Sequence, residues 1–64
     1  MDGKRLRQLR REQVLSQAEL ARSARTTQAA VSLLERGERT AQPRTVRKLA
    51  DALGVEPREL LAED

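Results

Sequence analysis

The amino-acid sequence predicts a compact all-α domain of five short helices, and three observations support this fold class. Apolar residues recur at helical spacing in four stretches of the chain. Residues that commonly begin and end helices stand at the boundaries of these stretches. Strand-forming residues are scarce, with four Val, four Thr, no Ile and no aromatic residue. A chain of 64 residues is long enough for one domain, which we expect to span 1–64.

The first helix is expected to begin at Asp2, a residue type that favours the N-cap position. Four side chains at helical spacing then share one face of this helix: Leu6, Leu9, Arg10 and Gln13.

The second helix is expected over 17–24. The segment Ser16-Gln17-Ala18-Glu19 has the pattern of a capping box, in which the serine oxygen accepts from the Glu19 amide while the glutamate reaches back. One face of this helix carries Leu20, Ala21 and Ala24, and the small Ala21 would allow a neighbouring helix to cross closely.

The third helix is expected over 28–36, with Thr27 as its N-cap and Gly37 as a left-handed residue just past its end. Only three residues separate it from the second helix. Such a short link between two amphipathic helices is typical of a helix-turn-helix, here over 17–36.

Pro43 suits the first turn of a fourth helix, and Gly54 suits its end. Its apolar face would carry Val46, Leu49, Ala50 and Leu53. A short fifth helix is expected from Pro57 to Leu61.

The composition argues against several classes of function. Without Cys and His, the chain lacks thiol nucleophiles, zinc–sulfur sites and the usual neutral-pH general base, so neither an enzyme nor a metal or cofactor is expected. Without aromatic residues it cannot stack nucleobases as single-strand binders do. So small a fold has little room for a ligand pocket, and no small-molecule ligand is expected.

The charge is divided unevenly along the chain. Residues 1–48 carry twelve basic and five acidic side chains, whereas 49–64 carry one basic and five acidic. A basic body with an acidic end indicates a polyanionic partner on one side. The charged start, Met1–Arg11, and the lack of a long apolar run predict no membrane association, and therefore a cytoplasmic protein.

The third helix is expected to have two dissimilar faces at 100° per residue. The inner face would carry Ala30, Val31, Leu34 and Glu35, and the outer face Gln28, Ala29, Ser32, Leu33 and Arg36. The outer side chains are short and uncharged until Arg36, which permits close approach to a DNA major groove. There, Gln pairs with adenine and Ala contacts a thymine methyl group.

At these residues the sequence resembles the Cro and phage-repressor (xenobiotic-response-element-type) helix-turn-helix proteins. The resemblance covers nearly the whole chain, through the segments LSQAELA, TTQAAVSLLERG and KLADALGV. It implies a five-helix fold that binds operator-like double-stranded DNA as a transcription regulator, usually as a dimer.

The resemblance also implies roles for individual residues. The base-reading positions correspond to Gln28, Ala29, Ser32 and Leu33, although Leu33 could equally be a plain exposed apolar residue. The phosphate-contacting positions correspond to Gln17, Thr27, Arg36, Arg39, Gln42 and Arg44, with Gln17 also bracing Gln28. Arg10 and Glu35 correspond to a structural ion pair, which we expect to be partly buried.

Three residues depart from the family's pattern. Arg25 and Val14 stand where glycines are usual, and Thr26 replaces a common apolar residue. A non-glycine residue in a left-handed conformation costs roughly 1 kcal/mol or more. Either these two turns are strained, or their backbone differs locally.

The sequence therefore predicts sequence-specific double-stranded DNA binding by a homodimer on a palindromic operator, with repression as the expected outcome. Val55 and Leu61 are the candidate dimer contacts, whereas Leu60 is expected to point inward. The alternative is a protein–protein interaction module on the same fold, such as an antitoxin or anti-repressor unit, with Leu33 and Leu61 as contacts.

Overall fold

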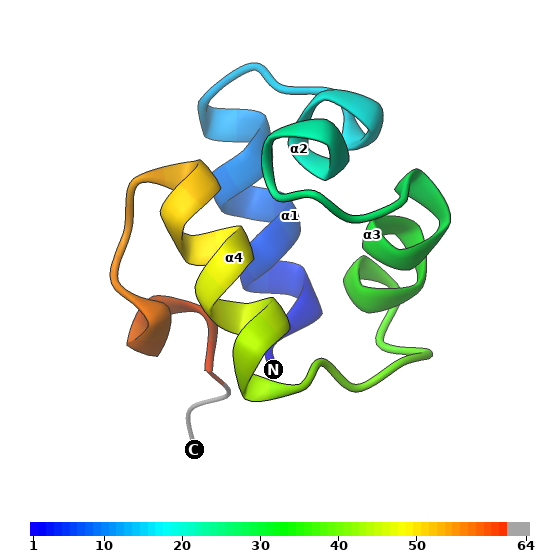
Figure 1. Ribbon diagram of the computed structural model, residues 1–64, viewed down its shortest axis with the longest axis vertical. Helices are drawn as coiled ribbons and strands as arrows, with labels where there is room; N and C mark the ends of the chain where they lie inside the picture. Colours follow the sequence, from blue (N-terminus) through cyan, green and yellow to red (C-terminus); the bar gives the residue numbers. More distant parts are fainter. Residues whose placement is uncertain (62–64) are drawn as a thin grey trace.

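The computed structural model describes residues 1–61 of the chain, and these residues form helices and turns without a strand (Figure 1). The all-α prediction is therefore confirmed. In chain order the elements are α1 (Gly3–Glu12), α2 (Gln17–Ser23), α3 (Gln28–Glu35), α4 (Pro43–Leu53) and the 3-10 turn η1 (Pro57–Leu60).

The expected fifth α-helix over 57–61 is wrong, because this segment is a single 3-10 turn. Its backbone bonds join residues three apart, from Glu59 to Glu56 and from Leu61 to Arg58, and Leu61 is already extended. The turn ends at Leu60, whose side chain is fully buried and whose carbonyl accepts from the Asp2 amide at 2.8 Å. The described residues therefore form four α-helices and one 3-10 turn.

The local signals at the helix ends are confirmed. The Ser16–Glu19 capping box is complete, with bonds of 3.0 Å and 2.8 Å, and Thr27 accepts from the Ala30 amide at 3.1 Å. Gly37 and Gly54 have φ values of 75° and 72°, the left-handed conformation expected of C-terminal glycines. The second and third helices each end one residue earlier than predicted, a difference typical of helix ends.

Val14 and Arg25 both adopt the left-handed conformation of the glycines that they replace, with φ values of 57° and 59°. The structure thus decides between the two alternatives in favour of strained turns. Val14 is also 87% exposed, so no burial of its side chain compensates for the strain.

Leucines from every α-helix and from η1 converge on one core. The fully buried side chains include Leu6 of α1, Leu20 of α2, Leu49 of α4 and Leu60 of η1, with Val31 of α3 beside them. The helix α3 packs on α1 and α2, while α4 packs on α2 and η1. No helix within 1–61 is long and apolar enough to cross a bilayer.

The helix α3 and the turn η1 lie on opposite sides of the molecule, with α1 and α4 between them (Figure 1). The extents of the domain along its principal axes are 29, 22 and 19 Å. One side of the fold therefore carries the pair α2 and α3, and the other carries the C-terminal turn.

Candidate nucleic-acid interface

The helices α2 and α3 form a tight helical pair. The turn between them is fixed by the amide of Thr26, which donates to the Ala21 carbonyl at 2.8 Å. Ala21 and Ala24 are both buried in the core.

The two faces of α3 differ as the sequence predicts. The inner positions are buried: Ala30, Val31, Leu34 and Glu35. On the outer face Gln28, Ala29 and Arg36 are exposed, and Ser32 and Leu33 are half-buried. All four predicted base-reading residues thus lie outside the core, on a helix whose orientation is fixed by its other face.

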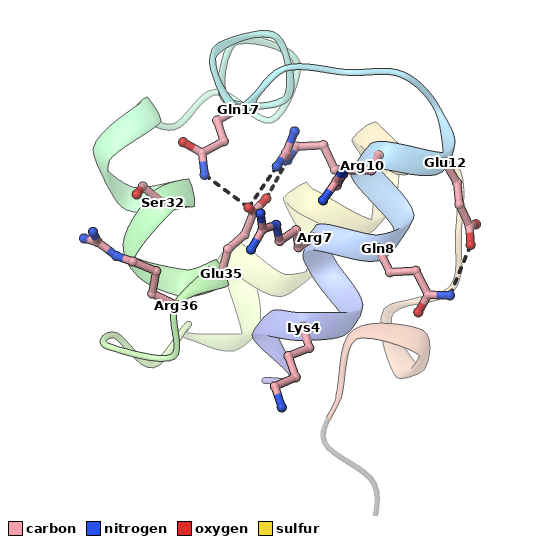
Figure 2. A pocket seen from close by; sticks show the side chains of 10 residues that line it. Lys4, Arg7, Gln8, Arg10, Glu12, Gln17, Ser32, Glu35 and Arg36 are labelled. Atoms are coloured by element: carbon pink, nitrogen blue, oxygen red, sulfur yellow. Dashed lines mark hydrogen bonds and ion pairs between the residues drawn. The ribbon is translucent and has the colours of Figure 1, made fainter.

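The orientation of α3 depends on a charged cluster around Glu35. Arg10 of α1 donates to both carboxylate oxygens, from Nε to Oε2 at 2.6 Å and from Nη2 to Oε1 at 3.0 Å. Gln17 of α2 donates to Oε1 at 3.1 Å, and Arg10 also donates to the Leu15 carbonyl at 2.7 Å. The hydrogen bonds that Arg10 donates to Glu35 raise the pKa of Arg10, burial lowers it, and the charge of the carboxylate raises it further. The cluster therefore ties three helices together (Figure 2).

The predicted phosphate-contacting residues lie in three places. Gln17 directs its amide group to Glu35, and Thr27 caps α3. Arg36 lies at the end of α3, with its Nε 3.6 Å from Oε2 of Glu38 and both side chains more than half exposed. The remaining three, in and after the loop that follows α3, are also exposed: Arg39, Gln42 and Arg44.

The close packing of α1 on α3 depends on Gly3, which sequence reasoning missed. A Cβ atom at this position would overlap the carbonyl oxygen of Leu34 and lie 2.8 Å from that of Glu35. Both are backbone atoms, which cannot turn aside as a flexible side chain does. The only local signal was a glycine at a helical position, where other residues are favoured.

A broad groove of about 1030 Å³ lies between α1 and α3. Figure 2 shows Lys4 and Arg7 on the α1 side, Ser32 and Arg36 on the α3 side, and the Glu35 cluster between them. Arg11 also lines the groove. Lys4, Arg7 and Arg11 were not among the individually predicted DNA contacts, although their spacing of three and four residues places them on one helix face.

The two candidate dimer contacts lie at the end of the chain distant from α3. Leu61 is 47% exposed. Val55 is half-buried and packs against the core, so only part of its side chain is available to another molecule.

Comparisons with known proteins agree with this arrangement. The helix-turn-helix family model matches residues 6–60. Among solved structures, the restriction-modification controller protein C.AhdI from Aeromonas hydrophila is similar, with 44% sequence identity and a TM-score of 0.89. The match covers 92% of this chain and 86% of that one. No curated protein matches at a significant level. The chain belongs to the helix-turn-helix family of Cro and phage-repressor type, whose members are DNA-binding transcription regulators.

Proposed function

We propose that this protein is a sequence-specific repressor that inserts α3 into the major groove of double-stranded DNA. The observation that carries the proposal is the division of α3 into a buried face and an outer face whose side chains are uncharged up to Arg36 at its end. A helix held rigidly by one face, with small residues on the other, fits the dimensions of the major groove.

The proposed base contacts are those of Gln28, Ala29, Ser32 and Leu33. Gln28 is the main reader, because its amide can donate to and accept from the edge of one adenine. Ala29 and Leu33 would contact thymine methyl groups, and the Ser32 hydroxyl can donate or accept.

The proposed backbone contacts fix the register of α3 on the duplex. They come from Gln17, Thr27, Arg36, Arg39, Gln42 and Arg44, which surround the recognition helix in sequence. Phosphate contacts position a protein without reading bases, so these residues should affect all sequences alike. The Gln17 amide group already donates a hydrogen bond to the Glu35 carboxylate. This bond would orient the Gln17 side chain for its phosphate contact.

We propose that two copies bind one palindromic operator. The longest dimension of the domain is 29 Å, whereas equivalent positions of the major groove recur about every 34 Å. One copy therefore engages one half-site, and a symmetric pair is needed for two. The likeness to a restriction-modification controller supports a regulatory role, and occupation of the groove would exclude other proteins from the same DNA.

The test is selection of bound duplexes from a random pool, first with the wild-type protein and then with Gln28→Ala. We expect the wild type to enrich one sequence motif and the variant to lose preference at one position in each half-site. The control is Asp51→Ala, a truncation at an exposed position of α4 outside the groove between α1 and α3, which should leave the motif unchanged.

Two results would contradict the proposal. An unenriched pool would exclude sequence-specific binding and favour the protein–protein interaction module. A motif that is unchanged by Gln28→Ala would show that this residue does not read a base.

A further inference from the structure

We propose that Lys4, Arg7 and Arg11, called here the α1 stripe, form a second phosphate-binding surface that extends the DNA contact beyond α3. This inference rests on the proposed function and deepens it. It assigns the groove between α1 and α3 to the DNA backbone that flanks the bases read by α3.

The first support is continuity with the proposed DNA-binding face. The α1 stripe lines the same groove as Gln17, Ser32 and Arg36. Each of these three is a proposed base or phosphate contact on α2 or α3. In Figure 2, Lys4 and Arg7 extend this surface away from α3 along α1.

The second support is that the three cations of the α1 stripe take part in none of the ion pairs within 1–61. The ion pairs within 1–61 involve other cations, namely Arg5 with Glu59, Arg10 with Glu35, and Arg36 with Glu38. The α1 stripe is exposed, and at the centre of the groove Glu35 is already neutralised by Arg10. The carboxylate of Glu12, which also lines the groove, accepts from Gln8 at 3.2 Å. The groove therefore presents a net positive surface.

The third support is length. Lys4 and Arg11 are seven residues apart, or about 10 Å along the helix axis. One strand of DNA carries one phosphate for about every 3.4 Å of duplex axis. The stripe is thus long enough for two or three successive phosphates of one strand.

The character of the groove favours a DNA backbone over a small nucleotide. A nucleotide site needs an enclosure and, commonly, an aromatic surface for the base. This groove is open along its length, and the chain has no aromatic residue.

The test compares two triple variants that remove the same charge. In the stripe variant, Lys4, Arg7 and Arg11 are changed to Gln. In the control variant, Arg22, Arg47 and Lys48 are changed to Gln, because these exposed cations of α2 and α4 do not line the groove. Binding to a fluorescent 30-base-pair duplex of random sequence is titrated by anisotropy between 50 and 300 mM KCl.

For the stripe variant we expect the slope of log K against log salt to become shallower by about 2 to 3, because each lost phosphate contact contributes about 0.9. The control variant should change the slope by less than about 1. The motif that the stripe variant selects from a random pool should remain that of the wild type, since phosphate contacts carry no base preference. If the triple variant fails to fold, the single variants Lys4→Gln and Arg7→Gln are titrated instead. Each should make the slope of log K against log salt shallower by about 1.

Equal slopes for the stripe and control variants would overturn the inference. So would a selected motif for the stripe variant that differs from that of the wild type. If the wild type selects a motif through Gln28 while the two slopes agree, only this inference fails. If the wild type binds no duplex, the proposed function fails with it.

Discussion

Arg10 and Glu35 form a two-pronged ion pair across the interface of α1 and α3. The guanidinium donates to both carboxylate oxygens, and the two side chains are only 11% and 3% exposed. The pair lies directly behind the outer face of α3. Its geometry therefore fixes both the packing of α3 and the direction in which the proposed base-reading residues point.

Removal of one partner of this pair should destabilise the fold. We expect Arg10→Met or Glu35→Leu alone to lower the free energy of unfolding by about 3 kcal/mol, because each leaves an uncompensated buried charge. The double variant should recover much of this loss. Urea unfolding followed by circular dichroism measures the effect, since the chain has no Trp or Tyr to report by fluorescence.

The control for this prediction is Arg5→Gln. It breaks the pair with Glu59, whose side chains are 35% and 38% exposed. An exposed pair of this kind contributes about 0–1 kcal/mol. A loss from Arg10→Met no larger than that from Arg5→Gln would contradict a structural role for the buried pair.

Gly3→Ala should destabilise the contact of α1 with α3. The added methyl group meets backbone oxygens of Leu34 and Glu35, so the helices must move apart. Overpacking of this kind typically costs about 1–3 kcal/mol in the free energy of unfolding. The comparison is Gly37→Ala, at a site with open space around it. There only the φ of 75° disfavours a side chain, and the free energy of unfolding should fall by about 1 kcal/mol. A Gly3→Ala protein as stable as the wild type would refute the close contact.

Val14→Gly and Arg25→Gly should each stabilise the protein. A left-handed conformation costs a non-glycine residue about 1–2 kcal/mol, and glycine removes this cost. The greater freedom of glycine in the unfolded chain offsets about 0.5–1 kcal/mol of the gain. A net gain of up to about 1.5 kcal/mol is expected from each, as a higher urea midpoint. Ala18→Gly, at an exposed position inside α2, should instead lose about 1 kcal/mol. Loss of stability in all three variants would show that the turns are not strained.

The capping box of α2 should make stability depend on pH. Hydrogen bonds from the backbone and side chain of Ser16, with a smaller effect of the Arg22 charge, lower the pKa of Glu19. Because the folded pKa lies below the unfolded value, this stabilisation is present at neutral pH and is lost as the pH falls through the folded pKa.

The measurement is the urea midpoint of wild type and Glu19→Gln between pH 7 and pH 3. Gln retains the reach-back hydrogen bond but cannot titrate. The advantage of the wild type should therefore shrink in acid. A difference that is constant across this range would contradict the role of the Glu19 charge.

Leu61→Lys should weaken self-association if the C-terminal turn is the dimer interface. The Leu61 side chain is 47% exposed, so the substitution leaves the core intact while a charge disrupts an apolar contact. Sedimentation equilibrium should show a shift from dimer to monomer with an unchanged circular dichroism spectrum. Val14→Lys is the matched change at an exposed apolar residue outside this turn. An equal effect of both variants would place the interface elsewhere.

The sequence by itself determined the local elements, because their causes lie within a few residues. The capping box at Ser16, the N-cap at Thr27 and the left-handed glycines at 37 and 54 are each fixed by neighbours in the chain. The same holds for the two faces of α3, which follow from the helical period. The helices, their order and the outer face of α3 were therefore predictable.

The tertiary structure alone decided what depends on distant contacts. The last element is a 3-10 turn, and its Leu60 carbonyl accepts from the amide of the distant Asp2. The need for glycine at position 3 arises from carbonyl oxygens more than thirty residues away. Likewise, the groove that gathers the α1 stripe beside α3 exists only once α1 packs on that helix. No local pattern encodes these contacts, because each depends on which distant segments the common core brings together.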